Sequence, residues 1–355
     1  MVALLGGVAL ILITVLFTLI YRVFTLVEIS KRKELGVTPE DGEVTTESGN
    51  RMHALLFIAF FFVGFGLFAW YSASASDKYV LPIASVHGES IDYLFWITTA
   101  VVVFVFVLTH VLLFFFPMIY SFKKDKRAHF YAHNNRLELV WTVIPAIVLT
   151  LLVVGGWRVW SDITAPAPEE AVQVEIMGKQ FNWQMRYGGA DNKVGRHDFR
   201  QIDATNSMGI DFVNDLATNK DDFTTNTLML PKGRDVLLKI WSRDVLHSVF
   251  LPHFRVKMDA VPGMPTQFWF RPTKTTEEMR AELKAKGDPN WEKFEYRLNC
   301  TEICGTSHFA MAARVVVVTE DEYEAWVKDQ EPWADKNKDY LAEKGIILPD
   351  MALND

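Results

Sequence analysis

Four long apolar runs occupy the first half of the chain, at residues 3–26, 54–72, 93–119 and 138–160. Because about 20 apolar residues are needed to cross the hydrocarbon core of a bilayer, each run predicts a membrane-spanning helix. A secretory signal peptide is the alternative interpretation of the first run. No Lys or Arg precedes that run and no small-residue cleavage site follows it, so we expect four spans.

The loops between these runs differ in basic residues, which concentrate on the cytoplasmic side of a membrane. The loop after the first run and the loop after the third are both rich in Lys and Arg, whereas loop 73–92 holds only Lys78. This asymmetry places both chain termini outside the cytoplasm. In a Gram-negative bacterium they would lie in the periplasm.

The pattern changes to a period of two from Val172 onward, where Val172, Val174 and Ile176 alternate with Gln173 and Glu175. Strict alternation is typical of a half-buried strand. Similar runs follow at 234–242, 265–271, 294–299 and 312–319, separated by Pro and Gly. Several short strands at this spacing predict a β-sandwich or Greek-key barrel.

The remaining segments are polar. Residues 188–225 and 273–292 predict surface insertions, the second with a short helix, and 321–328 predicts a short acidic amphipathic helix before a charged tail at 331–355. We therefore expect an α+β membrane protein with four parts: two additional N-terminal spans in 1–80, a transmembrane hairpin in 93–160, a β-domain in 165–320, and an acidic helix and tail in 321–355.

Charge is distributed unevenly between the two halves. Residues 1–160 carry 12 Lys and Arg against 11 Asp and Glu, whereas residues 161–355 carry 24 against 32. An acidic soluble domain argues against binding to nucleic acid, whose phosphates attract Lys and Arg. It suits a basic protein partner brought in by electrostatic steering, although solvation alone would also explain the acidity.

The most informative stretch is CTEICGTSHFAM at 300–311, which holds both cysteines of the chain. Two thiols, an imidazole, a thioether and a carboxylate lie within twelve residues. Soft sulfur ligands beside imidazole select copper or zinc, and a set that includes a weak thioether favours a copper that carries electrons. A second segment is needed to complete such a site, and His247 follows the alternating run that ends at Trp241.

These segments together resemble a known family. DVLHS at 244–248, KMDAVPG at 257–263 and CTEICGTSHFAM at 300–311 are similar to the copper-binding CuA domain of cytochrome c oxidase subunit II. WTVIP at 141–145 also matches the start of the second helix in that family's hairpin. The resemblance runs from about residue 134 to residue 319 and implies a cupredoxin-like fold for the β-domain. The family usually has two spans, so the resemblance does not cover residues 1–80.

The resemblance implies a dinuclear copper centre, with two bridging thiolates, one imidazole for each copper, a weak thioether ligand and one backbone carbonyl. The positions that match this ligand set are His247, Cys300, Glu302 (through its carbonyl), Cys304, His308 and Met311. Three alternatives remain open from the residues alone. The two cysteines could form a disulfide, two Cys and two His could hold a structural zinc, or a single redox copper could use one of the cysteines.

Further roles follow from the same resemblance. The Glu302 side chain and Asp259 are implied to contribute to a magnesium or manganese site shared with subunit I, a role that suits carboxylates. Solvation of Glu302 and turn capping by Asp259 are the simpler interpretations. Glu138 matches the carboxylate at the mouth of a proton path, although an end-of-helix anchor would look the same. For His110, inside the third run, we expect a hydrogen bond to a neighbouring helix, and we expect His253 at the surface.

The sequence departs from the family where electrons are received. GKQFNW at 178–183 resembles the aromatic segment over the copper pair, but Phe181 stands where Trp is frequent. Trp183 is present and could serve only as packing. Val249 and Met264 also replace a frequent Trp and Arg. These differences predict an altered docking surface and a donor other than a mobile mitochondrial-type cytochrome c, such as a membrane-attached haem domain.

The resemblance therefore implies the electron-transfer subunit of a proton-pumping haem-copper oxygen reductase in a bacterial inner membrane. Subunits I and III and a c-type cytochrome donor are the implied partners, and the haems would lie in partner chains, since no CxxCH motif occurs here. A membrane-tethered copper carrier is the alternative of a different class. Quinol oxidase subunit II lacks the copper ligands, and nitrous oxide reductase is soluble with a large catalytic domain.

Overall fold

The computed structural model describes residues 2–34, 36 and 47–348, without the side chains of residues 2–13 and 77–79. Four long helices come first: α1 (Val2–Glu34), α2 (Glu47–Tyr79), α3 (Val86–Ile119) and α4 (Asn135–Ile163). Within the described chain, three segments are long and apolar enough to cross a membrane: Glu47–Ser76, Val86–Ile119 and Asn135–Ile163. The first predicted span falls on α1, where the side chains of 2–13 lie outside the description, so it stays a prediction.

The chain divides into two units, 1–73 with 104–133, and 74–103 with 134–355. In the first unit, α2 packs on the second half of α3 through phenylalanines. Phe61 and Phe114, for example, lie 5.3 Å apart between ring centroids. His110 lies among these rings, 3.9 Å from the ring of Phe106, and its Nδ1 is 2.8 Å from the Phe106 carbonyl of its own helix. Among the described residues, His110 therefore bonds within its own helix and not to the neighbouring helix that we expected.

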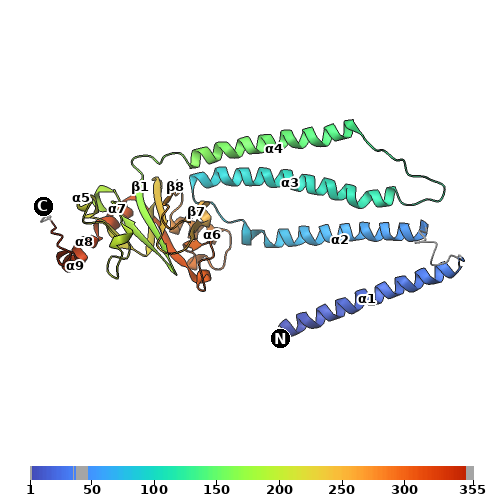
Figure 1. The fold of residues 1–355 in the computed structure, drawn as a ribbon, viewed down its shortest axis with the longest axis horizontal. Coiled ribbons are helices and arrows are strands. Elements are labelled where there is room, and N and C mark those ends of the chain that lie inside the picture. Colours follow the sequence, from blue (N-terminus) through green and yellow to red (C-terminus); the bar gives the residue numbers. More distant parts are fainter. Residues whose placement is uncertain (1, 35, 37–46, 349–355) are drawn as a thin grey trace. The chain divides into compact units, whose positions relative to one another are not determined.

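In the second unit, the β-domain consists of two five-stranded sheets (Figure 1). The first sheet has the order β3-β2-β1-β5-β8, and the second has the order β4-β10-β9-β6-β7. Their strands are β1 (Val172–Lys179), β2 (Asn182–Tyr187), β3 (Phe223–Thr225), β4 (Thr227–Pro231), β5 (Val236–Ser242), β6 (His247–Leu251), β7 (Val256–Ala260), β8 (Thr266–Phe270), β9 (Tyr296–Cys300) and β10 (Ala312–Val318). The predicted sandwich is confirmed, and all five expected strands are present.

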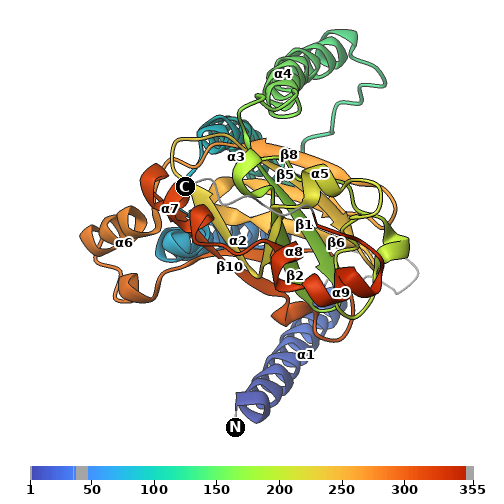
Figure 2. The same ribbon diagram turned by 90° about the vertical axis from the view of Figure 1, so that its left-hand side faces the viewer.

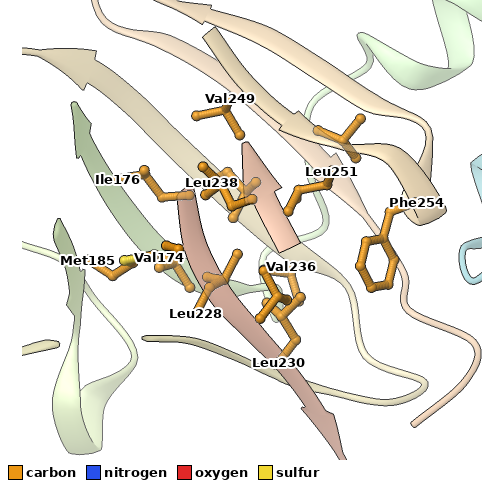
Figure 3. Close-up of a cluster of buried hydrophobic side chains, with 14 of the residues drawn as sticks. Val174, Ile176, Met185, Leu228, Leu230, Val236, Leu238, Val249, Leu251 and Phe254 are labelled. Atoms are coloured by element: carbon orange, nitrogen blue, oxygen red, sulfur yellow. The ribbon is translucent and has the colours of Figure 1, made fainter. Parts of the chain in front are cut away.

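The apolar positions of the alternating pattern face each other between the two sheets. Val174 and Ile176 of β1 pack with Leu238 of β5 against Val249 and Leu251 of β6 (Figure 3). Each of these side chains is fully buried. Burial of this kind stabilises by about 1.5–3 kcal/mol per large aliphatic side chain, so the sandwich provides a rigid framework for the loops at its edge.

A second hydrophobic core covers the outer face of β1 and β5. It joins Met177 and Trp241 of the sheet to Met208, Ile210 and Phe212 of the 188–225 segment, and to Trp333 and Leu341 near the C-terminus. The last two belong to α8 (Trp333–Lys336) and α9 (Lys338–Glu343), which follow α7 (Glu320–Lys328) and are labelled in Figure 2. The interpretation of 188–225 as a surface insertion and of 331–355 as a charged tail is therefore wrong for these buried residues.

The remaining short helices are α5 (Leu216–Asn219), in the 188–225 segment, and α6 (Thr276–Ala285), which is the helix expected in 273–292. Thr275 and Glu278 form a reciprocal capping box that begins α6. Thr319 and Glu322 do the same for α7, so the acidic helix expected at 321–328 is confirmed with one additional residue at its start.

Candidate metal centre

The sulfur-containing loop is closed by two strands of the second sheet. Cys300 is the last residue of β9, and Met311 directly precedes β10. The Cys300 amide donates to the Met311 carbonyl at 3.0 Å, which ties the two ends of the loop together. Strand β6 pairs with β9 on the other side, with Val249 opposite Cys300. This pairing brings His247, the first residue of β6, next to the loop.

The donor atoms of the predicted ligands lie close together. Cys300 Sγ is 3.9 Å from Cys304 Sγ, 3.8 Å from His247 Nδ1 and 3.3 Å from the Glu302 carbonyl. Cys304 Sγ is 3.5 Å from His308 Nδ1 and 3.7 Å from Met311 Sδ. Separations of 3.3–3.9 Å are expected between donors that share a metal at about 2.0–2.3 Å. The donor set therefore fits a soft metal.

The centre is largely shielded from solvent. His247 is fully buried, and Cys300, Cys304 and Met311 are 8 %, 3 % and 2 % exposed. Both cysteines are free thiols, because their sulfurs are far beyond the roughly 2.05 Å of a disulfide bond. Burial, and then the neighbouring Cys300, raise the pKa of the Cys304 thiol to about 11. A bound cation would reverse this preference, since a coordinating thiol gives up its proton.

Asp244 fixes the orientation of the His247 ring. Its Oδ1 lies 2.8 Å from His247 Nε2, and its Oδ2 accepts a 2.7 Å hydrogen bond from the Gln180 backbone amide. Burial alone would raise the pKa of Asp244, but the hydrogen bonds from Gln180 and His247 hold it below its ordinary value. A hydrogen bond donated by Nε2 to this carboxylate would leave the lone pair of Nδ1 facing Cys300.

Gln180 also contacts the sulfur-containing loop directly. Its side-chain Nε2 donates to the Cys304 carbonyl at 2.5 Å. Gln180 and Asp244 therefore join the β1–β2 turn, the imidazole and the loop into one hydrogen-bonded unit. We had not predicted a role for either residue. The position of Asp244 three residues before His247 was the available signal, whereas Gln180 is far from the ligands in sequence.

Two glycines allow this close packing. A Cβ at Gly178 would lie 2.9 Å from Cδ2 of His247, so only glycine lets the imidazole lie against β1. Gly305 has φ of +134°, and a Cβ there would lie 2.9 Å from Cζ of Phe181. The loop backbone therefore lies directly beneath the Phe181 ring. A larger residue at Gly305 would displace that ring, and a larger residue at Gly178 would displace the imidazole.

The two aromatic residues of the 178–183 segment occupy different environments. Trp183 is fully buried and lies edge-on to the His247 ring at 5.8 Å. Phe181 is half-buried over Gly305. Phe309 and Ile303, in the sulfur-containing loop itself, are 89 % and 85 % exposed. The structure thus gathers Phe181 and Trp183 around the centre and leaves an apolar surface on the loop.

Asp259 and Glu302 are linked through Ser248. The Ser248 hydroxyl donates to Asp259 Oδ1 at 2.7 Å, and the Ser248 carbonyl accepts from the Thr301 amide, one residue before Glu302. Asp259 is exposed and Glu302 is half-buried. Both carboxylates therefore belong to the same edge of the domain as the metal centre.

Two other predicted positions lie outside this cluster. Glu138 is exposed in the first turn of α4, whose N-cap is Asn134, and no contact among the described residues joins it to the loop. His253, which we expected at the surface, is half-buried and packs edge-on against Phe294 and Tyr296. Burial lowers the pKa of His253 to about 4, so its ring is neutral at physiological pH.

Apolar helices followed by a two-sheet domain with a buried His/Cys/Cys group define a membrane-anchored protein with a cupredoxin-like metal domain. Two family models match the chain. "Cytochrome C oxidase subunit II, transmembrane domain" matches residues 73–159, and "Cytochrome C oxidase subunit II, periplasmic domain" matches residues 172–277.

Individual proteins agree with these matches. The "Alternative cytochrome c oxidase subunit 2" of Bradyrhizobium diazoefficiens is 34 % identical over 261 residues, which cover 71 % of this chain and 84 % of that protein. The "Cytochrome c oxidase subunit 2" of Cereibacter sphaeroides is 26 % identical over 257 residues, covering 70 % and 78 %. The crystal structure of the periplasmic domain of subunit II (CoxB) of Bradyrhizobium japonicum is 22 % identical, covers 49 % of this chain and 99 % of that chain, and has a TM-score of 0.30. The chain belongs to the cytochrome c oxidase subunit II family.

Proposed function

We propose that this chain is the electron-accepting subunit of a bacterial haem-copper oxygen reductase and that it binds a dinuclear copper group, CuA. The carrying observation is the pairing of ligands around two sulfurs. Cys300 has His247 and the Glu302 carbonyl beside it, whereas Cys304 has His308 and Met311. Two thiolates that can each face two metals, with one imidazole apiece, match a dinuclear site better than a single-ion site.

When bound, the copper pair supplies one-electron transfer without bond chemistry. The protein residues hold that group in one geometry. Strands β6, β9 and β10 fix both ends of the ligand set. Asp244 restrains the His247 ring and Gln180 restrains the Cys304 carbonyl, while the burial of the sulfurs excludes water. Such a framework keeps ligands from relaxing when the charge of the site changes, which favours fast electron transfer.

The proposed setting is the inner membrane of a bacterium, with four spans, both termini outside and the copper domain in the periplasm. Residues 1–80 would add two spans to the hairpin in 93–160, ahead of the copper domain in 165–320 and the C-terminal segment in 321–355. Subunits I and III would be the membrane partners. Electrons would pass to a haem of subunit I, where oxygen reduction would be coupled to proton pumping.

Three further roles belong to this proposal. Glu302 and Asp259 would face subunit I and contribute to a magnesium or manganese site. The hydrogen bonds of Ser248 to Asp259 and to the Thr301 amide, next to Glu302, support this role. Glu138 would lie at the entrance of a proton path. Phe181 would mark where electrons arrive from a c-type cytochrome, and its half-buried position over Gly305 supports this role. Trp183 would assist from its place beside His247.

Copper analysis of the full-length chain tests the dinuclear assignment. We expect two coppers per chain and an EPR spectrum in which one unpaired electron couples to two copper nuclei. Cys304→Ser should abolish that spectrum, whereas Thr306→Ala, an exposed neighbour in the same loop, should retain it. One copper per chain, coupling to a single nucleus, or readily exchangeable cuprous copper would contradict the proposal and favour a copper carrier.

A further inference from the structure

The short segment between α2 and α3 is fastened to the β-domain. The Ala84 amide donates to the His253 carbonyl at 2.8 Å, and the Ala84 carbonyl accepts from Thr273 at 2.9 Å. Ser85 adds a 2.6 Å hydrogen bond from its hydroxyl to the Phe254 carbonyl. Ala84 and Ser85 are both fully buried. The chain just before α3 is therefore part of the domain rather than a free linker.

Arg255 is the centre of this attachment. Its Nε and Nη2 bind the two carboxylate oxygens of Asp92, in α3, at 2.7 and 2.8 Å. Nη2 also donates to the Leu81 carbonyl and Nη1 to the Pro252 carbonyl, both at 2.7 Å. The two ionic side chains are only 18 % and 19 % exposed. A two-pronged, largely shielded pair of this kind is stronger and more directional than a surface ion pair.

The backbone of Arg255 adds an independent observation. Its φ is +55°, in the left-handed region that side chains other than Gly, Asn and Asp rarely adopt. Glycine would take this conformation without strain. A residue held in a strained conformation points to a contact that requires its side chain, and the four hydrogen bonds of the guanidinium provide that contact.

The attachment is mechanically connected to the metal centre. Strand β6 begins at His247 and ends at Leu251, and residues 252–254 then form the single turn that leads into Arg255. At the other end of the attachment, α3 is 34 residues long. At roughly 1.5 Å per residue its length is about 51 Å, whereas the hydrocarbon core of a bilayer is about 30 Å thick. Its first turns contain Glu89 and Asp92, whereas its later turns are apolar, so these first turns extend beyond the membrane core as a stiff support.

We propose that Arg255 and Asp92 are positioning residues that lock the β-domain onto the first turns of α3 and so fix the metal centre relative to the membrane. The electron-transfer consequence rests on the proposed function, because the distance from the centre to a haem in a partner subunit would depend on this lock. The lock itself does not require copper.

Hydrogen exchange of the full-length chain in lipid nanodiscs tests the lock. Asp92→Asn removes the charge of the acceptor, and Arg255→Gly removes the side chain while relieving the backbone strain, which protects against simple misfolding. We expect the amides of Ala84, Val86 and Thr273 to exchange about tenfold faster or more in both variants, because a hydrogen bond to a charged group contributes at least that much to local stability.

Asp235→Asn is the matched control. Asp235 forms an equally two-pronged pair with Arg271, at 3.0 and 2.7 Å, within the β-domain, and the described structure gives neither side chain a hydrogen bond to α3. The Arg271 carbonyl accepts from the Val86 amide, so this control is compared at Ala84 and not at Val86. It should leave exchange at Ala84 unchanged, and core amides such as Val315 should be unchanged in every variant. Unchanged exchange at Ala84, Val86 and Thr273 in both Asp92→Asn and Arg255→Gly would overturn the lock.

A second readout addresses position rather than local stability. In the assembled oxidase, both variants should slow electron transfer from copper to the partner haem by about tenfold, with copper content and the EPR spectrum unchanged. Faster exchange with an unaltered transfer rate would overturn the positioning role and leave the proposed function intact. If the unmodified chain lacks a dinuclear copper signal, the proposed function fails, and the exchange experiment still decides the lock.

Discussion

Two buried carboxylates share one buried arginine beneath the second hydrophobic core. Arg186 lies 2.7 Å from Glu175 and 3.4 Å from Asp222, and none of these side chains is more than 4 % exposed. Burial would raise the pKa of Glu175, but Arg186 and His197 hold it below its ordinary value. Burial raises the pKa of Asp222 to about 8, against the smaller opposing effect of Arg186. The positive charge of Arg186 thus balances the carboxylate of Glu175, and Asp222 keeps its proton at neutral pH.

This arrangement makes folding stability depend on pH with a definite sign. In the unfolded chain Asp222 loses its proton near pH 4, whereas the folded protein retains it up to about pH 8. The folded state therefore binds one more proton within this window, and the free energy of unfolding falls as pH rises. Between pH 6 and pH 8 the loss is about 2 kcal/mol, since each pH unit contributes up to about 1.4 kcal/mol. The loss levels off above the folded pKa, once Asp222 is ionised in both states.

Asp222→Asn isolates this effect, because the amide has nearly the same shape and cannot ionise. Between pH 6 and pH 8, the Tm of the unmodified apo full-length chain should fall by about 4–8 °C more than the Tm of the variant. This value uses about 2–4 °C per kcal/mol for a domain of this size. Thermal unfolding in detergent measures this difference, and Asp329→Asn, at an exposed position, is the control. Parallel Tm curves for Asp222→Asn and the unmodified chain would refute the reasoning.

Three further outcomes follow from the metal centre. Asp244→Asn weakens the acceptor for His247 Nε2, so copper affinity should fall by about 10–100-fold in a competition titration, and an unchanged affinity would contradict the orienting role. Gly305→Ala would place a Cβ 2.9 Å from the Phe181 ring, at a backbone φ that favours glycine. We therefore expect a lower Tm and a lost or altered copper EPR signal. An unchanged Tm and EPR signal would show that the loop tolerates the substitution. Removing copper with a chelator should lower Tm, because a ligand at about 1,000 times its Kd stabilises by about 4 kcal/mol, and a metal-independent Tm would contradict binding to the folded state alone.

The candidate metal site in the sulfur-containing loop could be predicted because its donor side chains are nearly contiguous in sequence. Cys300, Cys304, His308 and Met311 lie within twelve residues, and the structure adds mainly their distances. The partner His247 was predicted from its place after the alternating run that ends at Trp241, and the structure shows it as the first residue of β6. Gln180 was not, because its contact with the Cys304 carbonyl exists only once the β1–β2 turn packs over the loop.

The second core could not be predicted for a different reason. Met208, Ile210 and Phe212 alternate with Gly209 and Asp211, but this run is only five residues long in a segment rich in Asp, Asn and Thr. Trp333 and Leu341 lie eight residues apart in a charged segment. Their burial depends on two segments more than 100 residues apart covering the same face of a sheet. Composition alone therefore suggested solvated segments where the chain forms a packed layer.

Arg255 has an unusual backbone conformation and contacts parts of the chain that are distant in sequence. Its left-handed backbone is invisible in the sequence, where an arginine after Phe254 suggests only a solvated turn. The same residue follows the turn at the end of β6, the strand that begins at His247, and it binds Asp92 of α3. A rigid ligand loop would have little value for electron transfer if the domain could tilt on its support. The sandwich shapes the metal centre, and the Arg255–Asp92 pair holds the sandwich in place, so both are needed. Loosening either should slow electron transfer even when every copper ligand is kept.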